Sequence, residues 1–265
     1  MKAFRLIGMA LLAIVMSANF TACSSDDDEI TKDDNGVITN QKKMVEMKMT
    51  TNSETVTSEL SYDTKGRLVS ITHTEKYGSN TDRDITNITW GENSVKESSD
   101  GESISYSLTD GLIRTGSDTD DRDYSFAYNS SKQLTTYQYG RKNDLNTRTL
   151  TWDNGKITKI VYSDNHDDDL TSEITYGNQT CKGYFPLVAL MVEDDFKLMI
   201  AHPELIGMRY TQLPSQINSK DGNVEYKEEY TYKLDKNEYV ESCTIKETKT
   251  GSIDIYTTNY TFKWE

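Results

Sequence analysis

The chain of 265 residues carries 43 Asp and Glu side chains against 29 Lys and Arg, so its formal net charge is −14. This length suffices for one large β domain or for two small ones. The negative charge argues against nucleic acid as a partner, because phosphates require a basic surface, and against adsorption to anionic lipid head groups.

Residues 1–22 have the features of a secretory signal peptide. Lys2 and Arg5 precede an apolar run from Leu6 to Val15, which is too short to span a membrane as a stable helix. The run is followed by Phe20-Thr21-Ala22-Cys23, which resembles the lipobox of bacterial lipoproteins, with Phe in the place that Leu usually takes. By that resemblance the chain is cleaved before Cys23 and lipidated on its sulfur.

Residues 23–40 are expected to form a disordered acidic tether, because like charges repel and keep such a run extended. The acidic block is Ser24-Ser25-Asp26-Asp27-Asp28-Glu29. Directly after the cysteine, it resembles the export signal with which Bacteroidetes lipoproteins reach the outer face of the outer membrane. The resemblance implies a lipid anchor in the outer membrane, with the protein facing the cell exterior. The alternative is a solvated linker on a periplasmic lipoprotein.

From residue 41 to residue 265 the sequence predicts a single domain of β-hairpins. An apolar residue followed two positions later by an aromatic one recurs at Leu60/Tyr62, Ile88/Trp90, Ile104/Tyr106, Phe126/Tyr128, Leu150/Trp152, Ile174/Tyr176, Tyr230/Tyr232 and Phe262/Trp264. Alternation places both members of each pair on one face of a strand. Asp, Asn or Gly follows most copies, as turns require.

The strands that leave these turns share a second feature. In Leu68-x-x-Ile71, Leu134-x-x-Tyr137 and Ile157-x-x-Ile160 the apolar spacing of three breaks strict alternation and predicts a bulge. The opposite strand faces are rich in Thr, Ser, Lys, Glu and Asn, as in an antiparallel sheet with one wet face. An all-β, up-and-down meander of about ten to fourteen strands is predicted. It curls or closes into a soluble barrel-like sheet, because closure buries the aromatic face and removes the edges.

Two acidic loops concentrate the hard oxygen ligands that calcium prefers. The candidate ligands are Asp118, Asp120 and Asp121 in one loop and Asp164, Asp167 and Asp168 in the other. Neither loop has the Gly and the terminal Glu of an EF-hand, so solvated hairpin tips are the favoured interpretation and calcium is the alternative. The three histidines, His73, His166 and His202, show no zinc-ligand spacing, and no cofactor is expected. For Cys181 and Cys243 the sequence leaves open a disulfide or two buried thiols.

Residues 184–217 break the strand pattern and predict a short helical insertion. Leu187, Leu190 and Met191 have helical spacing, and all three prolines of the chain, Pro186, Pro203 and Pro214, lie here. The segment is apolar enough to need burial. We expect it at the mouth or in the interior of the curled sheet, as a plug.

The unit Tyr62-Asp63-x-x-Gly66-Arg67-Leu68 resembles the YD-repeat of RHS-type proteins, and residues 128–134 and 152–157 are degenerate copies. Such copies behind a lipobox and an acidic block resemble a Bacteroidetes lipoprotein family described as a domain of unknown function with a porin-like fold. The resemblance covers most of residues 41–265. It implies a fold and a surface address, and it supplies no catalytic residues.

The function expected from the sequence is that of a non-enzymatic, surface-anchored binding or structural lipoprotein. Analogy with other Bacteroidetes surface lipoproteins suggests a glycan or host polymer as the ligand. No nucleophile elbow or phosphate-binding loop occurs. Tyr77, Tyr139 and Tyr184 are candidate platforms for sugar rings, although a core role is the more common one for tyrosine. The second hypothesis is a carrier that holds a hydrophobic ligand inside the barrel. The third is a hydrolase with an unrecognised site.

Overall fold

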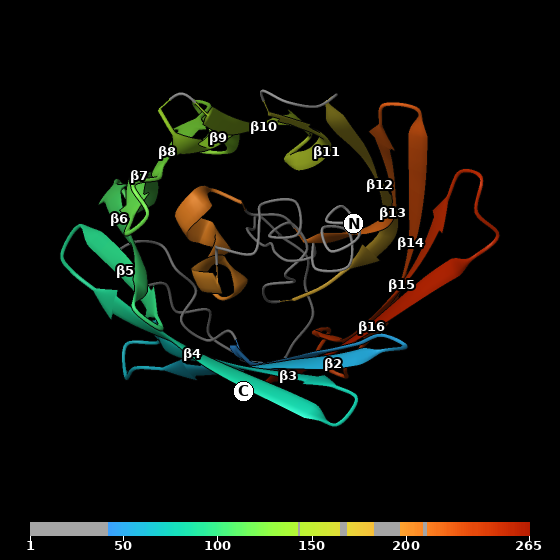
Figure 1. The fold of residues 1–265 in the computed structure, drawn as a ribbon, viewed down its shortest axis with the longest axis horizontal. Coiled ribbons are helices and arrows are strands. Elements are labelled where there is room, and N and C mark those ends of the chain that lie inside the picture. The colour runs from blue at the N-terminus through green and yellow to red at the C-terminus, as the bar shows by residue number, and fades with distance from the viewer. Residues whose placement is uncertain (1–41, 143, 165–168, 183–196, 209–210) are drawn as a thin grey trace, which may run out of the picture.

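The computed structural model describes residues 42–142, 144–164, 169–182, 197–208 and 211–265. They form an antiparallel sheet that closes into a barrel, in which each strand lies beside its neighbours in the chain (Figure 1). The strands are β1 (Met44–Thr50), β2 (Glu54–Tyr62), β3 (Leu68–Tyr77), β4 (Asn80–Trp90), β5 (Ser94–Ser99), β6 (Glu102–Thr109), β7 (Leu112–Asp118), β8 (Asp123–Tyr128), β9 (Leu134–Arg141), β10 (Asp144–Asp153), β11 (Lys156–Ser163), β12 (Leu170–Thr180), β13 (Gln212–Asp221), β14 (Val224–Leu234), β15 (Val240–Lys249) and β16 (Ile255–Trp264).

The predicted fold class is therefore confirmed, with sixteen strands in place of about ten to fourteen. The difference has a simple origin. Each copy of the apolar-x-aromatic pattern lies on an even-numbered strand, and an odd-numbered strand lies between successive copies. Eight copies thus correspond to eight strand pairs.

The barrel closes where its first and last strands meet. β1 pairs with β2 on one side and with β16 on the other, so that Met47 lies opposite both Ser58 and Phe262. Beyond the strands, the Lys43 N–H donates to the Glu265 carbonyl at 2.6 Å, and the Glu265 N–H donates to the Lys43 carbonyl at 2.9 Å. Closure leaves no open sheet edge that could pair with another chain.

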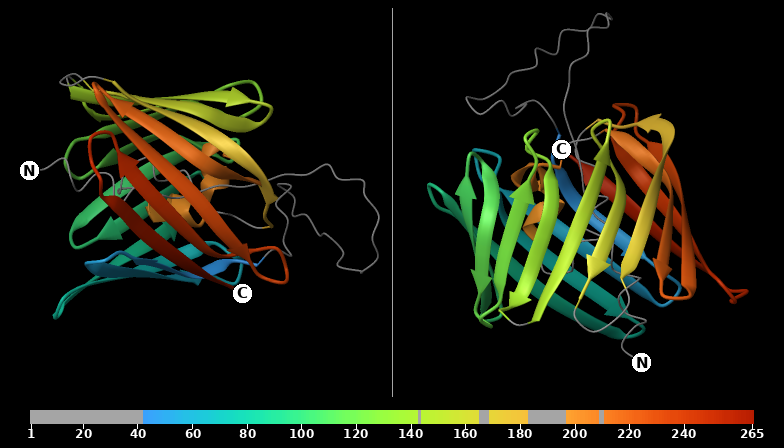
Figure 2. Two further views of the ribbon diagram at one scale, coloured as in Figure 1. Left: turned by 90° about the vertical axis from the view of Figure 1, so that its right-hand side faces the viewer. Right: turned by 90° about the horizontal axis from the view of Figure 1, so that it is seen from above.

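Most apolar positions of the strands face the interior. Leu68, Leu134 and Ile157, at or near the starts of their strands, are fully buried, and the buried apolar residues join into one core cluster. Burying a large apolar side chain contributes about 1.5–3 kcal/mol relative to leaving it exposed. The tilted strands wrap this core on all sides (Figure 2).

The predicted bulges are confirmed by the strand register. Tyr62 pairs with Leu68 and Ser61 with Ser70, which leaves Val69 as the extra residue on β3. The same shift occurs where Tyr128 meets Leu134 and where Trp152 meets Ile157. The bulge re-aims Leu68, Leu134 and Ile157, at or near the starts of β3, β9 and β11, toward the core.

Six aromatic side chains at the ends of even-numbered strands each donate a hydrogen bond to a carbonyl near the start of the preceding strand. The pairs are Tyr62 to Met44 (2.7 Å), Trp90 to Leu68 (2.8 Å), Tyr128 to Ile113 (2.5 Å), Trp152 to Leu134 (2.6 Å), Tyr176 to Ile157 (2.8 Å) and Trp264 to Val240 (2.8 Å). We call this end of the barrel the aromatic rim, and the opposite end the far rim. On β6 and β14 the equivalent positions are Leu108 and Leu234. Tyr106 and Tyr232 therefore lie two residues deeper than the sequence pattern suggested.

Two short 3-10 helices, η3 (Lys197–Ile200) and η4 (Pro203–Ile206), lie inside the ring of strands (Figure 1). We call residues 197–208 the plug. Its side chains Leu198, Met199, Ile206 and Met208 are almost fully buried, as the sequence predicted. None of the described helices is long and apolar enough to cross a membrane.

The end of the predicted insertion needs a correction. Residues 212–217 belong to strand β13, and Pro214 lies in it opposite Tyr176, at a register shift. A bulge is one of the few positions at which a sheet tolerates proline, because no ladder N–H is needed there. Pro186, Leu187, Leu190 and Met191 lie outside the described residues.

Candidate functional site

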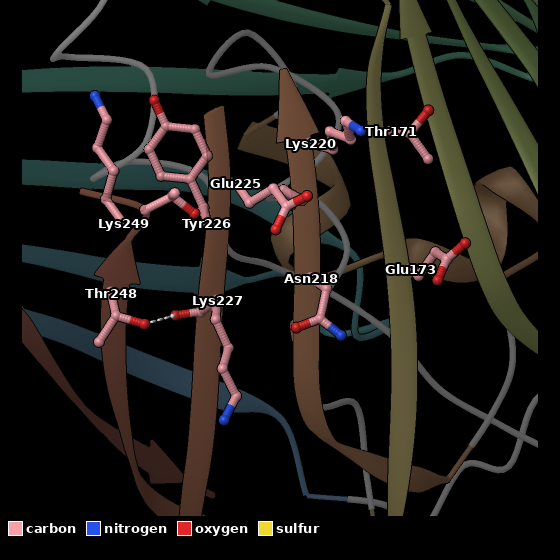
Figure 3. Close-up of a pocket in the computed structure, with 11 residues that line it drawn as sticks. Thr171, Glu173, Asn218, Lys220, Glu225, Tyr226, Lys227, Thr248 and Lys249 are labelled. Atoms are coloured by element: carbon pink, nitrogen blue, oxygen red, sulfur yellow. Dashed lines mark hydrogen bonds between the residues drawn. The ribbon is translucent and has the colours of Figure 1, made fainter. Parts of the chain in front are cut away.

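An open groove of about 650 Å³ spans β12 to β15 (Figure 3). Its lining residues come mainly from the polar positions that alternate with buried ones. On β12, Glu173 lies between buried Ser172 and Ile174, and on β13, Asn218 follows buried Ile217. The groove is therefore built largely on the outer face of the barrel wall.

Strand register arranges these side chains in two rows across the four strands. The first row is Glu173, Asn218, Lys227 and Thr248, and the second is Thr171, Lys220 and Glu225, with Thr250 beside it. Tyr226 and Lys249, which pair with each other between the two rows, also line the groove, and the Lys249 ammonium lies 5.3 Å from the centre of the Tyr226 ring.

Both charge signs alternate over short distances in this groove. Lys227 pairs with Glu229 at 2.6 Å, beside the lining, and the Thr248 hydroxyl donates to the Lys227 carbonyl at 3.4 Å. Among the described residues no ion-pair partner is found for Lys220, whose side chain is exposed. Hydroxyl, amide, carboxylate and ammonium groups thus offer donors and acceptors together. That chemistry suits a polar ligand with many hydrogen-bonding groups better than a strongly charged or apolar one.

The arrangement most like a catalytic one lies inside the barrel. Ser58 and His73 are cross-strand partners, with the Ser58 hydroxyl 3.2 Å from His73 Nδ1, and Asp84 is the partner of His73 on β4. Ser58 is only 1% exposed, so no substrate reaches its hydroxyl. Burial and the nearby Lys197 ammonium lower the pKa of His73. The group is a cross-strand contact between β2, β3 and β4.

The carboxylate of Asp84 instead binds Lys197 of the plug. Lys197 of η3 donates to Asp84 at 2.6 Å and to Thr86 at 3.1 Å, while the Leu198 N–H donates to the buried carboxylate of Glu97 at 3.2 Å. At the other end of the plug, His202 precedes η4 and accepts the Leu68 N–H on Nε2 at 3.0 Å. These polar contacts fix the plug to β3, β4 and β5.

Asp118, predicted as a calcium candidate, closes the β7–β8 turn. Its carboxylate accepts the backbone N–H groups of Asp120 and Arg122, both at 2.9 Å, and also bonds the Arg122 guanidinium at 2.6 Å and the Tyr124 hydroxyl at 2.9 Å. Burial alone raises the pKa of Asp118, but these donors outweigh it and hold the pKa below its usual value. A carboxylate with four such donors holds the turn together.

Three of the other calcium candidates lie in the described residues. Asp120 and Asp121 are exposed turn residues, and Asp164 accepts a hydrogen bond from Tyr162 at 3.2 Å. Asp167 and Asp168 lie outside the described residues. Within the described ranges, no group of three His, Cys, Asp or Glu side chains is placed to hold a metal ion.

Of the remaining predicted residues, some are buried, one is exposed and others lie outside the described residues. Cys181 and Cys243 are buried free thiols in the described part of the chain, and burial raises the pKa of Cys181 to about 12. Tyr139 is wrong as a sugar platform, because it is 5% exposed and stacks on Tyr137. Tyr77 is 59% exposed at the end of β3. Tyr184, the predicted lipidation site Cys23 and the export block of residues 24–29 lie outside the described residues.

The groove itself is absent from the sequence predictions. Its residues read as ordinary members of a wet strand face, because the pattern along one strand does not reveal which side chains of four strands lie side by side. Only the register between β12 and β15 brings them into two rows.

Comparison with known proteins supports the fold. The family model described as "Domain of unknown function (DUF4595) with porin-like fold" matches residues 60–242. A crystal structure of a porin-like protein from Bacteroides uniformis superposes with a TM-score of 0.64 at 18% identity, covering 84% of this chain and 96% of the other. A second, from Bacteroides vulgatus, gives a TM-score of 0.58 at 13% identity, over 84% and 99%. At such identities the likeness concerns the fold alone. No curated protein matches the chain.

Proposed function

Because the chain belongs to the family of domains of unknown function with a porin-like fold, we propose that it is a non-enzymatic lipoprotein of the bacterial outer membrane whose β12–β15 groove binds a polar, hydroxyl-rich polymer such as a glycan. The lipid anchor would be attached at Cys23. The acidic block of residues 24–29 favours the outer leaflet, with the periplasmic face as the alternative.

The observation that carries this proposal is the position of the groove relative to the chain ends. Lys43 and Glu265 are hydrogen-bonded at the aromatic rim, and the Lys42 N–H donates to the Tyr239 hydroxyl at 3.0 Å. A tether that starts at Cys23 therefore joins the barrel at that rim. The β13–β14 turn beside the groove lies at the far rim, so an anchored barrel holds the groove away from the membrane.

The outer surface of the wall supports anchoring over spanning. A barrel that crosses a bilayer needs an apolar outer band. Here the exposed outward positions include Glu59, Lys96, Thr151 and Lys233, although Ile85 is an exception at 43% exposure. Charged side chains at the middle of a bilayer cost about 2–4 kcal/mol each for Lys or Arg.

The interior gives less support to a carrier or a hydrolase. Plug side chains belong to the buried core cluster, and η4 lies against β7, so a hydrophobic ligand would compete with them there. Ser58, the serine next to His73, is buried, so it offers a hydrolase no accessible nucleophile.

Binding of the purified barrel to a glycan array, followed by titration of any ligand found, tests the proposal. The double variant Asn218→Ala/Lys220→Ala removes one side chain from each row and is expected to weaken binding at least tenfold. The matched control, Thr89→Ala/Lys96→Ala, changes exposed outward residues on β4 and β5 and is expected to bind normally. Equal affinity of both variants for the same glycan would refute the groove as the site.

A further inference from the structure

Two glutamates face each other across β14 and β15 on the inner side of the wall that carries the groove. Glu228 is the direct cross-strand partner of Glu247. Glu228 lies two residues before the inward-facing Tyr230, and Glu247 lies two residues after the inward-facing Ile245, so both face the interior. Their neighbours Lys227 and Thr248 line the groove. Directly opposed residues of an antiparallel pair have Cβ atoms about 4.5–5.5 Å apart, and like charges there are destabilising.

The surroundings of this pair offer little to neutralise two negative charges. The Tyr230 hydroxyl donates a hydrogen bond to Glu228, and the residue opposite Glu228 on β13 is Ile217, which has no charge. The other titratable groups around the pair, among the described residues, are Tyr226 and Tyr232 on β14, Cys243 and Lys249 on β15, and Tyr256 and Tyr260 on β16. Lys249 is the only cation in this described set, and it lies over the Tyr226 ring.

We propose that Glu228 and Glu247 share a proton at neutral pH, and that this proton holds β14 and β15 together behind the groove. A protonated carboxyl removes the repulsion and supplies a donor for its partner, so the pairing is tightest while the proton is bound. Its loss leaves two opposed carboxylates in a largely enclosed site.

The pKa values agree in direction with this geometry. Burial is the main cause that raises the pKa of Glu228 to about 7; the Tyr230 hydrogen bond lowers this pKa, and the charge of Glu247 raises it by a smaller amount. Burial also raises the pKa of Glu247, while Lys249 opposes the rise. These values belong to the pair, because two coupled carboxyls titrate together.

The sign of the pH effect follows from the raised pKa. A carboxyl whose pKa is higher in the folded protein than in the unfolded chain contributes full stability below its ordinary value of 4.5, and this contribution is lost as the pH rises through about 7. The lowered pKa of His73 acts in the opposite direction, since its contribution is lost as the pH falls. Comparison of variants, and not the wild-type curve alone, therefore isolates the pair.

Thermal unfolding of the barrel from pH 5 to pH 8.5 tests the inference. Glu228→Gln removes the charge and keeps the size, so we expect a melting temperature above that of the wild type at pH 8 and a much smaller decline between pH 5 and pH 8. Glu229→Gln is the matched control, because Glu229 is the next residue, faces outward and pairs with Lys227. It should show the wild-type decline. Equal declines in the wild type and Glu228→Gln would overturn the proposal.

A direct titration covers the case in which a variant folds poorly. Carbon-13 NMR of the side-chain carboxyls in the wild-type protein is expected to show a Glu resonance that titrates near pH 7 and is missing in Glu228→Gln. Titration of every Glu near its ordinary value would overturn the proposal. Neither measurement involves a ligand, so failure of the groove to bind a glycan would leave this result unaffected, and the reverse also holds.

Discussion

Four turns are each closed by the side chain of one residue, namely Asp63, Asp118, Asn129 or Asp235. In each, one side-chain oxygen accepts the backbone N–H groups two and four residues further along the chain. The sequence identified the turns at Asp63 and Asn129 correctly. For Asp118 it favoured a hairpin tip and left calcium as the alternative, because one residue type provides both turn acceptors and calcium ligands. Only the positions of the N–H groups distinguish the two uses.

Removing the Asp118 carboxylate is expected to destabilise the barrel. Asp118→Ala should cost about 1–3 kcal/mol, because buried donors lose their acceptor. Asp118→Asn should cost less, since Asn129 closes its own turn with an amide. Urea unfolding at pH 7 measures both, with exposed Asp120→Ala as a control near zero. Because the pKa of Asp118 is lowered, its contribution is present above the ordinary pKa of 3.8 and is lost as the pH falls below it. Equal costs for the Ala and Asn variants would contradict this account.

Single side-chain hydrogen bonds are also expected to stabilise the aromatic rim. Tyr176→Phe deletes only the hydroxyl that donates to the Ile157 carbonyl at 2.8 Å, so it should cost about 1 kcal/mol in the free energy of unfolding. Tyr77→Phe removes the hydroxyl of an exposed ring and should be neutral within error. If both variants unfold at the same urea concentration, the rim hydrogen bonds do not stabilise the barrel.

At the scale of elements, local sequence patterns predicted the features that depend on a single strand. They missed the features that depend on the alignment of several strands. The alternation at Leu60/Tyr62 correctly predicted which strand face points inward, and the spacing Leu68-x-x-Ile71 correctly predicted the bulge. The composition around Leu198 gave a buried plug. The end of the insertion was wrong because Pro214 reads as a strand breaker, whereas β13 accommodates it at a register shift. The groove was missed because its rows exist only once β12 to β15 are aligned.

The junction between the plug and the wall provides a sharp test of the plug. Gly207 ends η4 with a φ of 67°, and a Cβ added there would lie 1.9 Å from the Lys132 carbonyl oxygen. Gly251 has a similar φ of 81° but nothing within 4 Å. Gly251→Ala should therefore cost about 1–2 kcal/mol through backbone conformation alone. Gly207→Ala should cost clearly more, because the plug must shift. Urea unfolding that ranks the two variants equally would show that the contact with Lys132 is unimportant.

The whole molecule is a barrel with two different ends. Its chain ends and the plug contacts with Leu68 and Trp90 lie toward the aromatic rim, while the groove extends toward the far rim. The hairpin repeats in the sequence predicted both the barrel-like sheet and the family. The sequence did not predict a ligand site, since no short motif encodes one. The anchor at Cys23 remains a prediction from the sequence.

Labelling of intact cells tests the proposed arrangement most directly. Asn223→Cys places a thiol on the exposed β13–β14 turn beside the groove, while Cys181 and Cys243 are buried. In Bacteroides cells that express the full chain, a membrane-impermeant maleimide should label this variant before lysis and should not label the wild type. Adding Cys23→Ser should abolish the anchor and release the protein from the membrane fraction. Labelling only after lysis, or membrane attachment that persists without Cys23, would contradict a lipid-anchored barrel that presents its groove to the cell exterior.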